Sequence, residues 1–214
     1  TDPTGSLSYY NGEMQNCAEE YCTYVLEQYE KAKEYCSDPL VFIEQRLDFS
    51  RYVENGFGTG DCVIIADEVL HIIDYKHGLG VLVESEGNTQ MMCYALGALE
   101  AFDDLYDVNT IEMTIFQPRR ENVSTWSISK EELLTWAEEV LEPTAALAYE
   151  GKGEFKAGDH CQFCKVKATC RKRAETNLEL AKYDFEMPAT LDDIEIAAIL
   201  PRIDQLISWG NDIK

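Results

Sequence analysis

The chain has 214 residues and a formal net charge of −22, from 18 Lys and Arg against 40 Asp and Glu. This charge argues against a protein that binds nucleic acid through a basic surface as a whole, although an acidic shell can still enclose a metal site. The composition, 45% hydrophobic and 11% aromatic, is that of a folded chain, and we find neither an apolar run near the roughly 20 residues of a membrane span nor a signal-peptide pattern.

Steps of three and four between apolar residues predict helices, and alternation or short apolar runs predict strands. The predicted elements are, in chain order, a helix at 13–36, a strand at 40–49, a hairpin of strands at 62–66 and 69–75, a helix at 89–102, strands at 110–117 and 123–128, a helix from 129 to about 149 that is kinked near Pro143, and one or two helices within 191–214 that are divided at Pro201. The glycine-rich segment 55–60 is predicted to turn the chain before the hairpin.

This order of elements predicts an α/β or α+β core with a mixed sheet over residues 1–150. Residues 151–214 are predicted to form a cysteine-bearing segment with C-terminal helices that pack on the core. Because the sequence lacks an initiating Met and stops just after an apolar helical pattern, we expect a fragment of a longer chain.

Two carboxylates and a lysine are predicted to meet at one end of the hairpin. Asp61 and Asp74 each lie six residues from the turn at Asp67-Glu68, so pairing of the strands brings them together. Asp74 and Lys76 project from the same face because they are two residues apart in a strand. Two close carboxylates repel each other unless a cation lies between them, and oxygen ligands favour Mg²⁺ or Mn²⁺. Each residue alone is more simply a turn, strand-end or surface residue, but their shared register favours a site.

A second pair of polar residues follows on the next helix. Gln90 and Tyr94 are one helical turn apart, so both project from one face. Alone, Tyr94 is a half-buried aromatic residue and Gln90 a polar residue of the first turn. Their position just after the hairpin predicts a second layer around the same site, and Asn88 or Thr89 is the expected helix cap.

These motifs occur in an order that resembles a known family. Gly58-x-Gly60-Asp61, Asp74-Tyr75-Lys76 and Gln90-x-x-x-Tyr94 are together similar to the RecB-like branch of the PD-(D/E)XK nuclease superfamily. The run 74–80 with Asn88-x-Gln90-Met91 more closely resembles an uncharacterised phage and prophage family of exonucleases with a C-terminal cysteine cluster. The resemblance extends from about residue 40 to the end of the cysteine cluster.

The resemblance implies a fold, an activity and partners. The implied fold is a restriction-endonuclease-like mixed sheet flanked by helices. The implied activity is that of a Mg²⁺- or Mn²⁺-dependent deoxyribonuclease, of exonuclease type, in phage or prophage recombination or repair. DNA and other recombination or phage proteins are the implied partners, and a cytoplasmic location without membrane contact is expected.

The resemblance also implies roles for individual residues. Asp61 and Asp74 would bind the divalent metal, Lys76 would assist the attacking water, and Gln90 and Tyr94 would support the metal site or position the nucleic-acid backbone.

Three further acidic residues lie where such nucleases often carry an acidic residue or a histidine. Glu44 on the preceding strand lies where these enzymes often carry an acidic residue, and a salt bridge with Arg46 is the alternative. Many relatives also carry a His or Glu on an upstream helix, for which Glu19 and Glu20 are the candidates here unless the counterpart precedes Thr1.

Three of the eight cysteines form a C-x₂-C-x₅-C pattern: Cys161, Cys164 and Cys170. The other five are scattered singly through periodic segments, which argues against a disulfide scaffold and for a reducing cytosol with one metal or cluster site. Two thiolates at the first spacing can reach one metal from a single turn. RecB-like nucleases with a [4Fe–4S] cluster share this spacing, which implies a fourth ligand far upstream: Cys17, Cys22, Cys36 or a residue outside this chain. Zinc with His160, or three unmetallated thiols, are the alternatives.

A basic patch surrounds these cysteines, formed by Lys165, Lys167, Arg171, Lys172 and Arg173. It is either an ordinary solvated face or a surface that tracks phosphates toward the metal site, which Arg119-Arg120 would extend.

Two functional interpretations are therefore open, a metal-dependent nuclease and a non-catalytic nucleic-acid-binding or assembly protein that retains the fold. The intact set of Asp61, Asp74 and Lys76 favours the first. The net charge of −22 favours the second, or a partner that supplies the grip on DNA.

Overall fold

The computed structural model describes residues 8, 10–102, 106–185 and 190–214 of the chain. It divides the chain into two compact units, which we call the core unit (Thr1–Gly151) and the C-terminal unit (Lys152–Lys214). The predicted packing of the C-terminal segment on the core stays a prediction.

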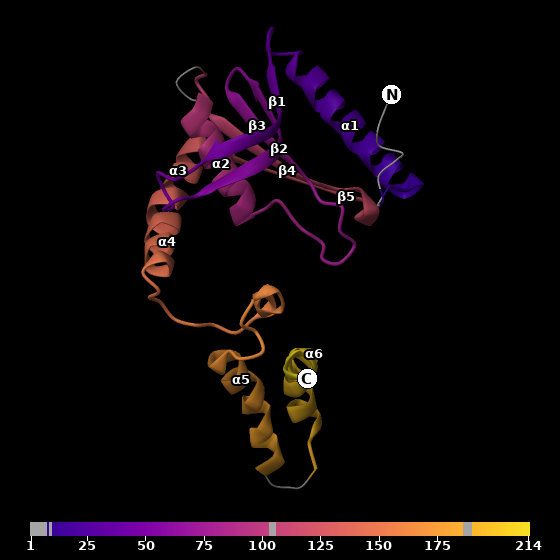
Figure 1. Cartoon of the computed structure of the whole chain (residues 1–214), viewed down its shortest axis with the longest axis vertical. Coiled ribbons are helices and arrows are strands. Elements are labelled where there is room, and N and C mark those ends of the chain that lie inside the picture. Colours follow the sequence, from indigo (N-terminus) through magenta and orange to yellow (C-terminus); the bar gives the residue numbers. More distant parts are fainter. Residues whose placement is uncertain (1–7, 9, 103–105, 186–189) are drawn as a thin grey trace. The chain divides into compact units, whose positions relative to one another are not determined.

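The core unit is built on a five-stranded mixed sheet in which the strands lie in chain order (Figure 1). The strands are β1 (Leu40–Asp48), β2 (Phe57–Ala66), β3 (Val69–Tyr75), β4 (Thr110–Gln117) and β5 (Asn122–Ser129). Neighbouring strands are antiparallel except for β3 and β4, which are parallel and joined through α2 (Thr89–Phe102). The predicted α+β fold, a mixed sheet flanked by helices, is confirmed.

Alternating residues of β2 pack into two different clusters, one on each face of the sheet. Cys62 and Ile64 pack with α1 (Gly12–Ala32), whereas Val63 and Ile65 pack with α2. The period of two in a strand and the apolar stripe of each helix explain this division. The result is a three-layer core unit with a larger apolar cluster on the α2 side, to which α3 (Lys130–Trp136) also contributes.

Close approach of α2 to β1 depends on a glycine. A Cβ atom on Gly97 would lie 2.9 Å from Leu47 Cβ, 3.0 Å from Leu47 C and 3.1 Å from the backbone nitrogen of Asp48. Because two of these three atoms belong to the backbone, the strand cannot move aside without moving its pairing partner.

The start of β2 differs from the prediction. Segment 55–60 was predicted to turn the chain, but β2 already begins at Phe57, so Gly58 and Gly60 lie within a strand. A Cβ atom on Gly58 would overlap the ring of Tyr94, and one on Gly60 would lie 2.8 Å from Leu47 Cδ1. These glycines therefore serve packing against the α2 side rather than a turn.

The predicted helix from residue 129 to about 149 is interrupted. Ser129 and Glu132 form the predicted capping box, with Glu132 N donating to Ser129 Oγ at 3.1 Å and Ser129 N donating to Glu132 Oε2 at 2.8 Å. After α3 the chain follows a π-helical turn, Ala137–Leu141, and continues as α4 (Glu142–Tyr149). Pro143 at the start of α4 lacks an N–H, which is consistent with the predicted irregularity at this point.

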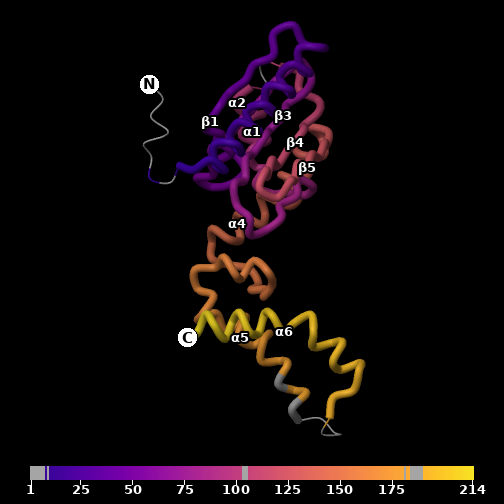
Figure 2. The backbone as a smooth tube through the Cα atoms, turned by 90° about the vertical axis from the view of Figure 1, so that its right-hand side faces the viewer, coloured from indigo at the N-terminus to yellow at the C-terminus, as the bar shows by residue number. Residues whose placement is uncertain are grey.

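The C-terminal unit contains two α-helices, α5 (Arg171–Leu178) and α6 (Asp193–Ile213), and two short 3₁₀ helices within the residues that the structure describes. Helix α6 is continuous through Pro201, so this proline does not divide it into two helices. The tube of α6 changes direction along its length (Figure 2). Arg173 joins the two helices, since its guanidinium donates to Asp212 Oδ2 at 2.6 Å. None of the described helices has the length and apolar content that crossing a bilayer would require.

Candidate functional site

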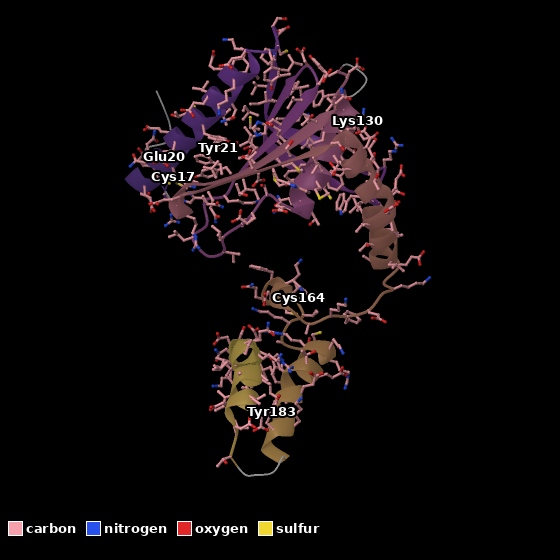
Figure 3. The ribbon with its side chains drawn as sticks, turned by 180° about the vertical axis from the view of Figure 1, so that it is seen from behind. Cys17, Glu20, Tyr21, Lys130, Cys164 and Tyr183 are labelled. Atoms are coloured by element: carbon pink, nitrogen blue, oxygen red, sulfur yellow. The ribbon has the colours of Figure 1, made fainter. Side chains whose placement is uncertain are left out.

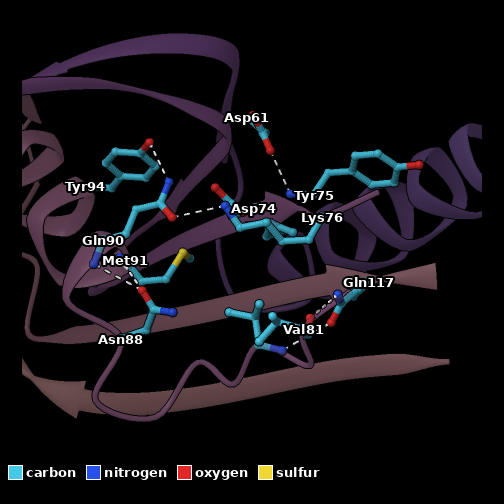
Figure 4. A network of polar contacts seen from close by, with 12 residues as sticks. Asp61, Asp74, Tyr75, Lys76, Val81, Asn88, Gln90, Met91, Tyr94 and Gln117 are labelled. Carbon is cyan, nitrogen blue, oxygen red and sulfur yellow. Dashed lines mark hydrogen bonds and ion pairs between the residues drawn. The ribbon is translucent and has the colours of Figure 1, made fainter. Parts of the chain in front are cut away.

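The β2 and β3 strands part where the predicted carboxylates lie. Their ladder runs from Ala66 opposite Val69 to Cys62 opposite Ile73, and the next pair would be Asp61 opposite Asp74. At this point Tyr75 N donates instead to Asp61 Oδ2 at 2.7 Å. The Asp61 side chain thus replaces a main-chain acceptor at the opening of the sheet. As predicted from the hairpin, Asp61 and Asp74 come together, and Figure 4 shows both at this opening.

Asp74 is the most buried charged group of the site, at 3% exposed. Lys76 Nζ lies 2.8 Å from Asp74 Oδ2, close enough for a charge-assisted hydrogen bond. The two groups therefore form a close ion pair. Burial raises the pKa of Asp74, and the Asp61 charge adds to that increase, while Lys76 opposes it.

A buried carboxylate beside a second carboxylate fits a hard divalent cation, which would relieve their mutual repulsion. Among the described residues, no three His, Cys, Asp or Glu side chains gather closely enough to hold a metal. Asp61 and Asp74 would therefore be the protein's contribution at this site. Mg²⁺ is commonly held by one or two carboxylates, with waters and phosphate oxygens completing its coordination, so the donor set is suitable.

A chain of hydrogen bonds connects Lys76 to α2 (Figure 4). Lys76 Nζ donates to Gln90 Oε1 at 3.0 Å, and Gln90 Nε2 donates to Tyr94 OH at 2.8 Å. Asn88 Oδ1 accepts from Gln90 N at 3.1 Å and from Met91 N at 3.2 Å, so Asn88 caps the helix. The predicted second layer is thus in contact with the Asp74–Lys76 pair.

Glu44 lies on β1, at the position opposite Asp61 of β2. The pairs Ile43 with Cys62 and Gln45 with Gly60 flank this position. Its φ of 53° lies in the left-handed region, which side chains with a Cβ atom rarely adopt. The predicted alternative, a salt bridge to Arg46, is not among the ion pairs of the described residues; Arg46 lies over the ring of Phe57, 4.0 Å from its centroid.

Tyr21 on α1 is a residue of this region that sequence reasoning missed. Its hydroxyl donates to Ile73 O at 3.4 Å, and its ring packs 5.1 Å from that of Tyr75. Figure 3 labels Tyr21 on α1. Burial raises the pKa of Tyr21, and the nearby Cys62 thiol and carboxylates of Asp61, Asp74 and Glu44 raise it further. In the sequence, Tyr21 is simply one apolar position of an amphipathic helix, so no local signal marks it.

Comparison with known proteins places the chain in a family. The model of the family described as "Protein of unknown function (DUF2800)" matches residues 2–214. The chain belongs to the DUF2800 family. Among solved structures, the crystal structure of SSO0001 is similar over 76% of this chain and 79% of its own length, with 12% sequence identity and a TM-score of 0.30.

The upstream acidic candidates of this DUF2800 chain lie on the exposed side of α1. Glu19 Oε1 accepts from Gln15 Nε2 at 2.6 Å, and neither Glu19 nor Glu20 contacts Asp61 or Asp74 in the hydrogen bonds and ion pairs described. The charge of Glu20 acts instead on Tyr75, whose pKa it raises after the larger effects of burial and of Cys17.

The three clustered cysteines of the DUF2800 chain lie in the C-terminal unit, where Figure 3 labels Cys164. Cys161 is 8% exposed and its Sγ accepts from Gly158 N at 3.4 Å, whereas Cys164 and Cys170 are partly exposed. The described residues do not bring these thiols together into a metal-binding group, so the [4Fe–4S] or zinc site stays a prediction. The proposed alternative zinc ligand, His160, has its Nε2 3.0 Å from Lys156 O.

The three upstream cysteines that were candidates for a fourth ligand differ in burial. Cys17 and Cys36 are buried in the core unit, at 6% and 5% exposed, whereas Cys22 is exposed. A buried thiol would have to leave its packing to reach a metal. Of these three thiols, Cys22 is the exposed one.

The residues of the predicted basic patch differ in their contacts and exposure. Arg173 is 5% exposed and bound to Asp212, so it holds the C-terminal unit together rather than facing a phosphate. Lys167 also pairs with Asp212, at 2.9 Å, and Lys172 lies 3.7 Å from Glu175. The remaining members, Lys165 and Arg171, are exposed.

The residues that would extend the patch are also engaged. Arg119 pairs with Glu13 at 2.8 Å, and Arg120 donates to the backbone oxygen of Leu79 at 2.9 Å.

Replacing Asp61 by alanine and by asparagine should separate its structural and ligand roles. The Asp61→Ala variant leaves Tyr75 N–H without its acceptor, so we expect a loss of about 1–3 kcal/mol in the free energy of unfolding. The amide oxygen of an asparagine can still accept this bond, so Asp61→Asn should remain near wild type in stability. Urea unfolding measures the difference, and equal destabilisation by both variants would contradict the structural role of the carboxylate oxygen.

Proposed function

We propose that this DUF2800 chain is a divalent-metal-dependent nuclease that hydrolyses phosphodiester bonds in DNA. The observation that carries the proposal is the meeting of Asp61, the buried Asp74 and Lys76 where β2 and β3 part. The resemblance of the three motifs to RecB-like PD-(D/E)XK nucleases supports the same reaction. Its exonuclease type and its role in phage or prophage recombination or repair rest on that resemblance.

Each side chain has a distinct task in this proposal. A Mg²⁺ or Mn²⁺ ion at Asp61 and Asp74 would supply Lewis-acid activation of water and phosphate. The Lys76 ammonium, held 3.0 Å from Gln90 Oε1, can orient a water or stabilise negative charge that develops on a phosphate oxygen. Gln90 is itself fixed by Tyr94 and by the cap of α2, so the ammonium is held in place before substrate binds.

We also propose a [4Fe–4S] cluster, with zinc as the alternative, at Cys161, Cys164 and Cys170. Metal and sulfide analysis of the anaerobically purified chain tests it, and Cys161→Ser should lose the bound metal. Cys93→Ser, which removes a thiol outside the cluster, is the control and should retain it. Metal content unchanged in Cys161→Ser would contradict the site.

A non-catalytic nucleic-acid-binding or assembly protein is the alternative function. It is favoured by the net charge of −22 and by the engagement of Arg173 and Lys167 in ion pairs, which weakens the predicted phosphate-tracking patch. Activity measurements decide between the two functions.

The test compares wild type with Asp74→Asn in cleavage of end-labelled single- and double-stranded DNA, with Mg²⁺, Mn²⁺ or EDTA. We expect divalent-dependent cleavage by the wild type and a decrease of at least about 10²-fold in the variant. Glu30→Gln, which removes an exposed carboxylate of α1, is the matched control and should cleave like the wild type. Cleavage that survives in Asp74→Asn would assign the activity to another site or to a contaminant.

The Asp74→Asn variant, which should lose cleavage activity, should gain thermal stability. Burial raises the pKa of Asp74 in the folded state. The protonated Asp74 side chain therefore contributes stability below its unfolded-state pKa of 3.8, and this contribution is lost as the pH rises through the folded-state pKa. At pH 7 the ionised carboxylate therefore lowers stability, so without divalent metal Asp74→Asn should have the higher Tm. Thermal unfolding from pH 5 to 8 measures this, and a lower Tm for Asp74→Asn at pH 7 would show that the Lys76 pair outweighs burial.

A further inference from the structure

Tyr21 of α1 contacts the residues on both sides of Asp74. Its hydroxyl donates to Ile73 O at 3.4 Å, and its ring centroid lies 5.1 Å from that of Tyr75. Ile73 directly precedes Asp74 in the chain, and Tyr75 directly follows it. One side chain on the α1 side of the sheet thus supports the short segment that carries a candidate metal ligand.

The ring of Tyr21 also supports the strand beside this segment. It lies 5.6 Å from the ring of Phe116 on β4, and the backbone oxygen of Phe116 accepts from Lys76 N at 2.9 Å. The backbone of Lys76 is therefore fixed by a residue against which Tyr21 packs. Both members of the Asp74–Lys76 ion pair are thus held at the backbone by neighbours of one tyrosine.

Tyr21 lies where β3 loses its partner on one side. The ladder between β2 and β3 ends at Ile73, whereas the ladder between β3 and β4 continues to Tyr75. Beyond Ile73, strand pairing therefore holds β3 on the β4 side. On the β2 side, Asp61 Oδ2 accepts from Tyr75 N at 2.7 Å, and Tyr21 adds its contacts from α1.

A metal ligand in this position depends on such support. Two neighbouring carboxylates repel each other, so without a cation the charges of Asp61 and Asp74 favour separation. Mg²⁺ demands a nearly ideal octahedral geometry, and a ligand displaced by more than about 0.5 Å binds it less well. A segment that is held by β4 on one side and by a packed aromatic side chain on the other keeps the carboxylate of Asp74 in one place.

We propose that Tyr21 is a positioning residue of the candidate metal site, which holds residues 73–75 so that the Asp74 carboxylate is presented to the divalent cation. The inference rests on the proposed function, and Tyr21 acts through Asp74 rather than on the cation itself. Its hydroxyl fixes the backbone at Ile73, and its ring packs on Tyr75 and Phe116. Removal of the hydroxyl should therefore weaken cation binding, and removal of the ring should weaken it more.

The test measures Mn²⁺ binding to wild type, Tyr21→Phe and Tyr21→Leu by electron paramagnetic resonance of the free ion. The relevant Mn²⁺ site is the one that Asp74→Asn removes. Tyr21→Phe keeps the ring and loses the hydroxyl, whereas Tyr21→Leu loses both. Tyr24→Phe and Tyr24→Leu are the matched controls, because Tyr24 is the next aromatic residue of α1, packs against the same apolar cluster and lies 5.0 Å from the ring of Phe116.

We expect the Kd of Mn²⁺ at this site to rise about 3-fold in Tyr21→Phe and about 10-fold or more in Tyr21→Leu, since a hydrogen bond and then a packed ring are lost. Cleavage should fall at low Mn²⁺ and recover at saturating Mn²⁺, with the KM for DNA unchanged. Both Tyr24 variants should bind Mn²⁺ within about twofold of wild type. A merely structural role would instead lower the Tm of the Tyr21 and Tyr24 variants alike and leave the Kd of the folded proteins unchanged.

Binding without turnover separates failure of the inference from failure of the proposed function. If wild type binds Mn²⁺ through Asp74 but cleaves no DNA, the nuclease proposal fails, and weaker Mn²⁺ binding in the Tyr21 variants would still support the inference. If wild type cleaves DNA and the Kd is unchanged in both Tyr21 variants, the inference is overturned and the nuclease proposal stands.

The remaining outcomes also decide. Equal weakening of Mn²⁺ binding by the Tyr24 variants would overturn the inference, because Tyr21 would then have no special role. Tyr21→Phe, which keeps the packed ring, decides alone if Tyr21→Leu does not fold. If wild type binds no Mn²⁺ through Asp74, both the inference and the proposed metal site are overturned.

Discussion

Replacing Lys76 with alanine is expected to lower divalent-dependent cleavage of DNA by at least about 10²-fold, the usual effect of removing a group that stabilises charge in the transition state. Lys76 is the ammonium that the described residues place against Asp74, 2.8 Å from Oδ2, and it also contacts Gln90. Its loss would remove both the charge beside the phosphate and the link between the sheet and α2.

The same variant should also change Asp74. Since the Lys76 charge lowers the pKa of Asp74 against the effect of burial, that pKa should rise further in Lys76→Ala. The ionised carboxylate is then buried without a partner, so stability at pH 7 should fall. In the double variant Asp74→Asn/Lys76→Ala the stability should be partly restored, because the unpaired charge is gone.

Cleavage assays and thermal unfolding of the four proteins in this cycle measure both effects. Lys33→Ala, which removes an exposed lysine that pairs with Glu30 on α1, is the matched control and should behave like the wild type. Cleavage by Lys76→Ala equal to that of wild type would show that another site or a contaminant carries the activity. No restoration in the double variant would contradict the electrostatic coupling of Lys76 and Asp74.

Replacing Gly97 with alanine is expected to destabilise the protein, although the same change at an open helix position stabilises by about 0.5–1 kcal/mol. The added Cβ would lie 2.9 Å from Leu47 Cβ and 3.0 Å from Leu47 C, and these atoms belong to a strand that is paired with β2. Overpacking against such a rigid neighbour costs about 1–3 kcal/mol.

Gly210→Ala in α6 is the matched control, since a Cβ atom on Gly210 meets nothing within 4 Å. We expect it to leave stability unchanged or to raise it slightly. Urea unfolding followed by circular dichroism compares the variants, and cleavage should also fall in Gly97→Ala because α2 carries Gln90 and Tyr94. Stabilisation by Gly97→Ala would contradict the close approach of α2 to β1.

The sequence by itself was sufficient for those features that depend on near neighbours. The order of helices and strands follows from periodicity, and the register of β2 with β3 follows from a two-residue connection, so the meeting of Asp61 with Asp74 could be counted from the turn. The contact of Gln90 with Tyr94 follows from one helical turn. The capping box at Ser129 is equally local.

Only the tertiary structure decided those features that depend on distant segments. Gly58 lies in a strand because it pairs with Leu47 of β1, with the Tyr94 ring where its Cβ would be. Tyr21 reaches the site from the other face of the sheet where β2 and β3 part. Arg173 is a structural ion pair because Asp212 meets it from another helix. Such contacts join residues far apart in the chain, and no periodicity records them.

The anchoring of the loop between β3 and α2 is of the same kind. The sequence predicts a break at 77–80 followed by a short apolar run at 81–83, and the shape of this loop depends on the buried amide of Gln117, located on a strand beyond α2. Local patterns thus determined the elements and the pairing that brings the carboxylates together. Packing between elements decided which side chains are buried, which are engaged and which are exposed to meet a ligand, because burial and hydrogen bonding depend on neighbours in space.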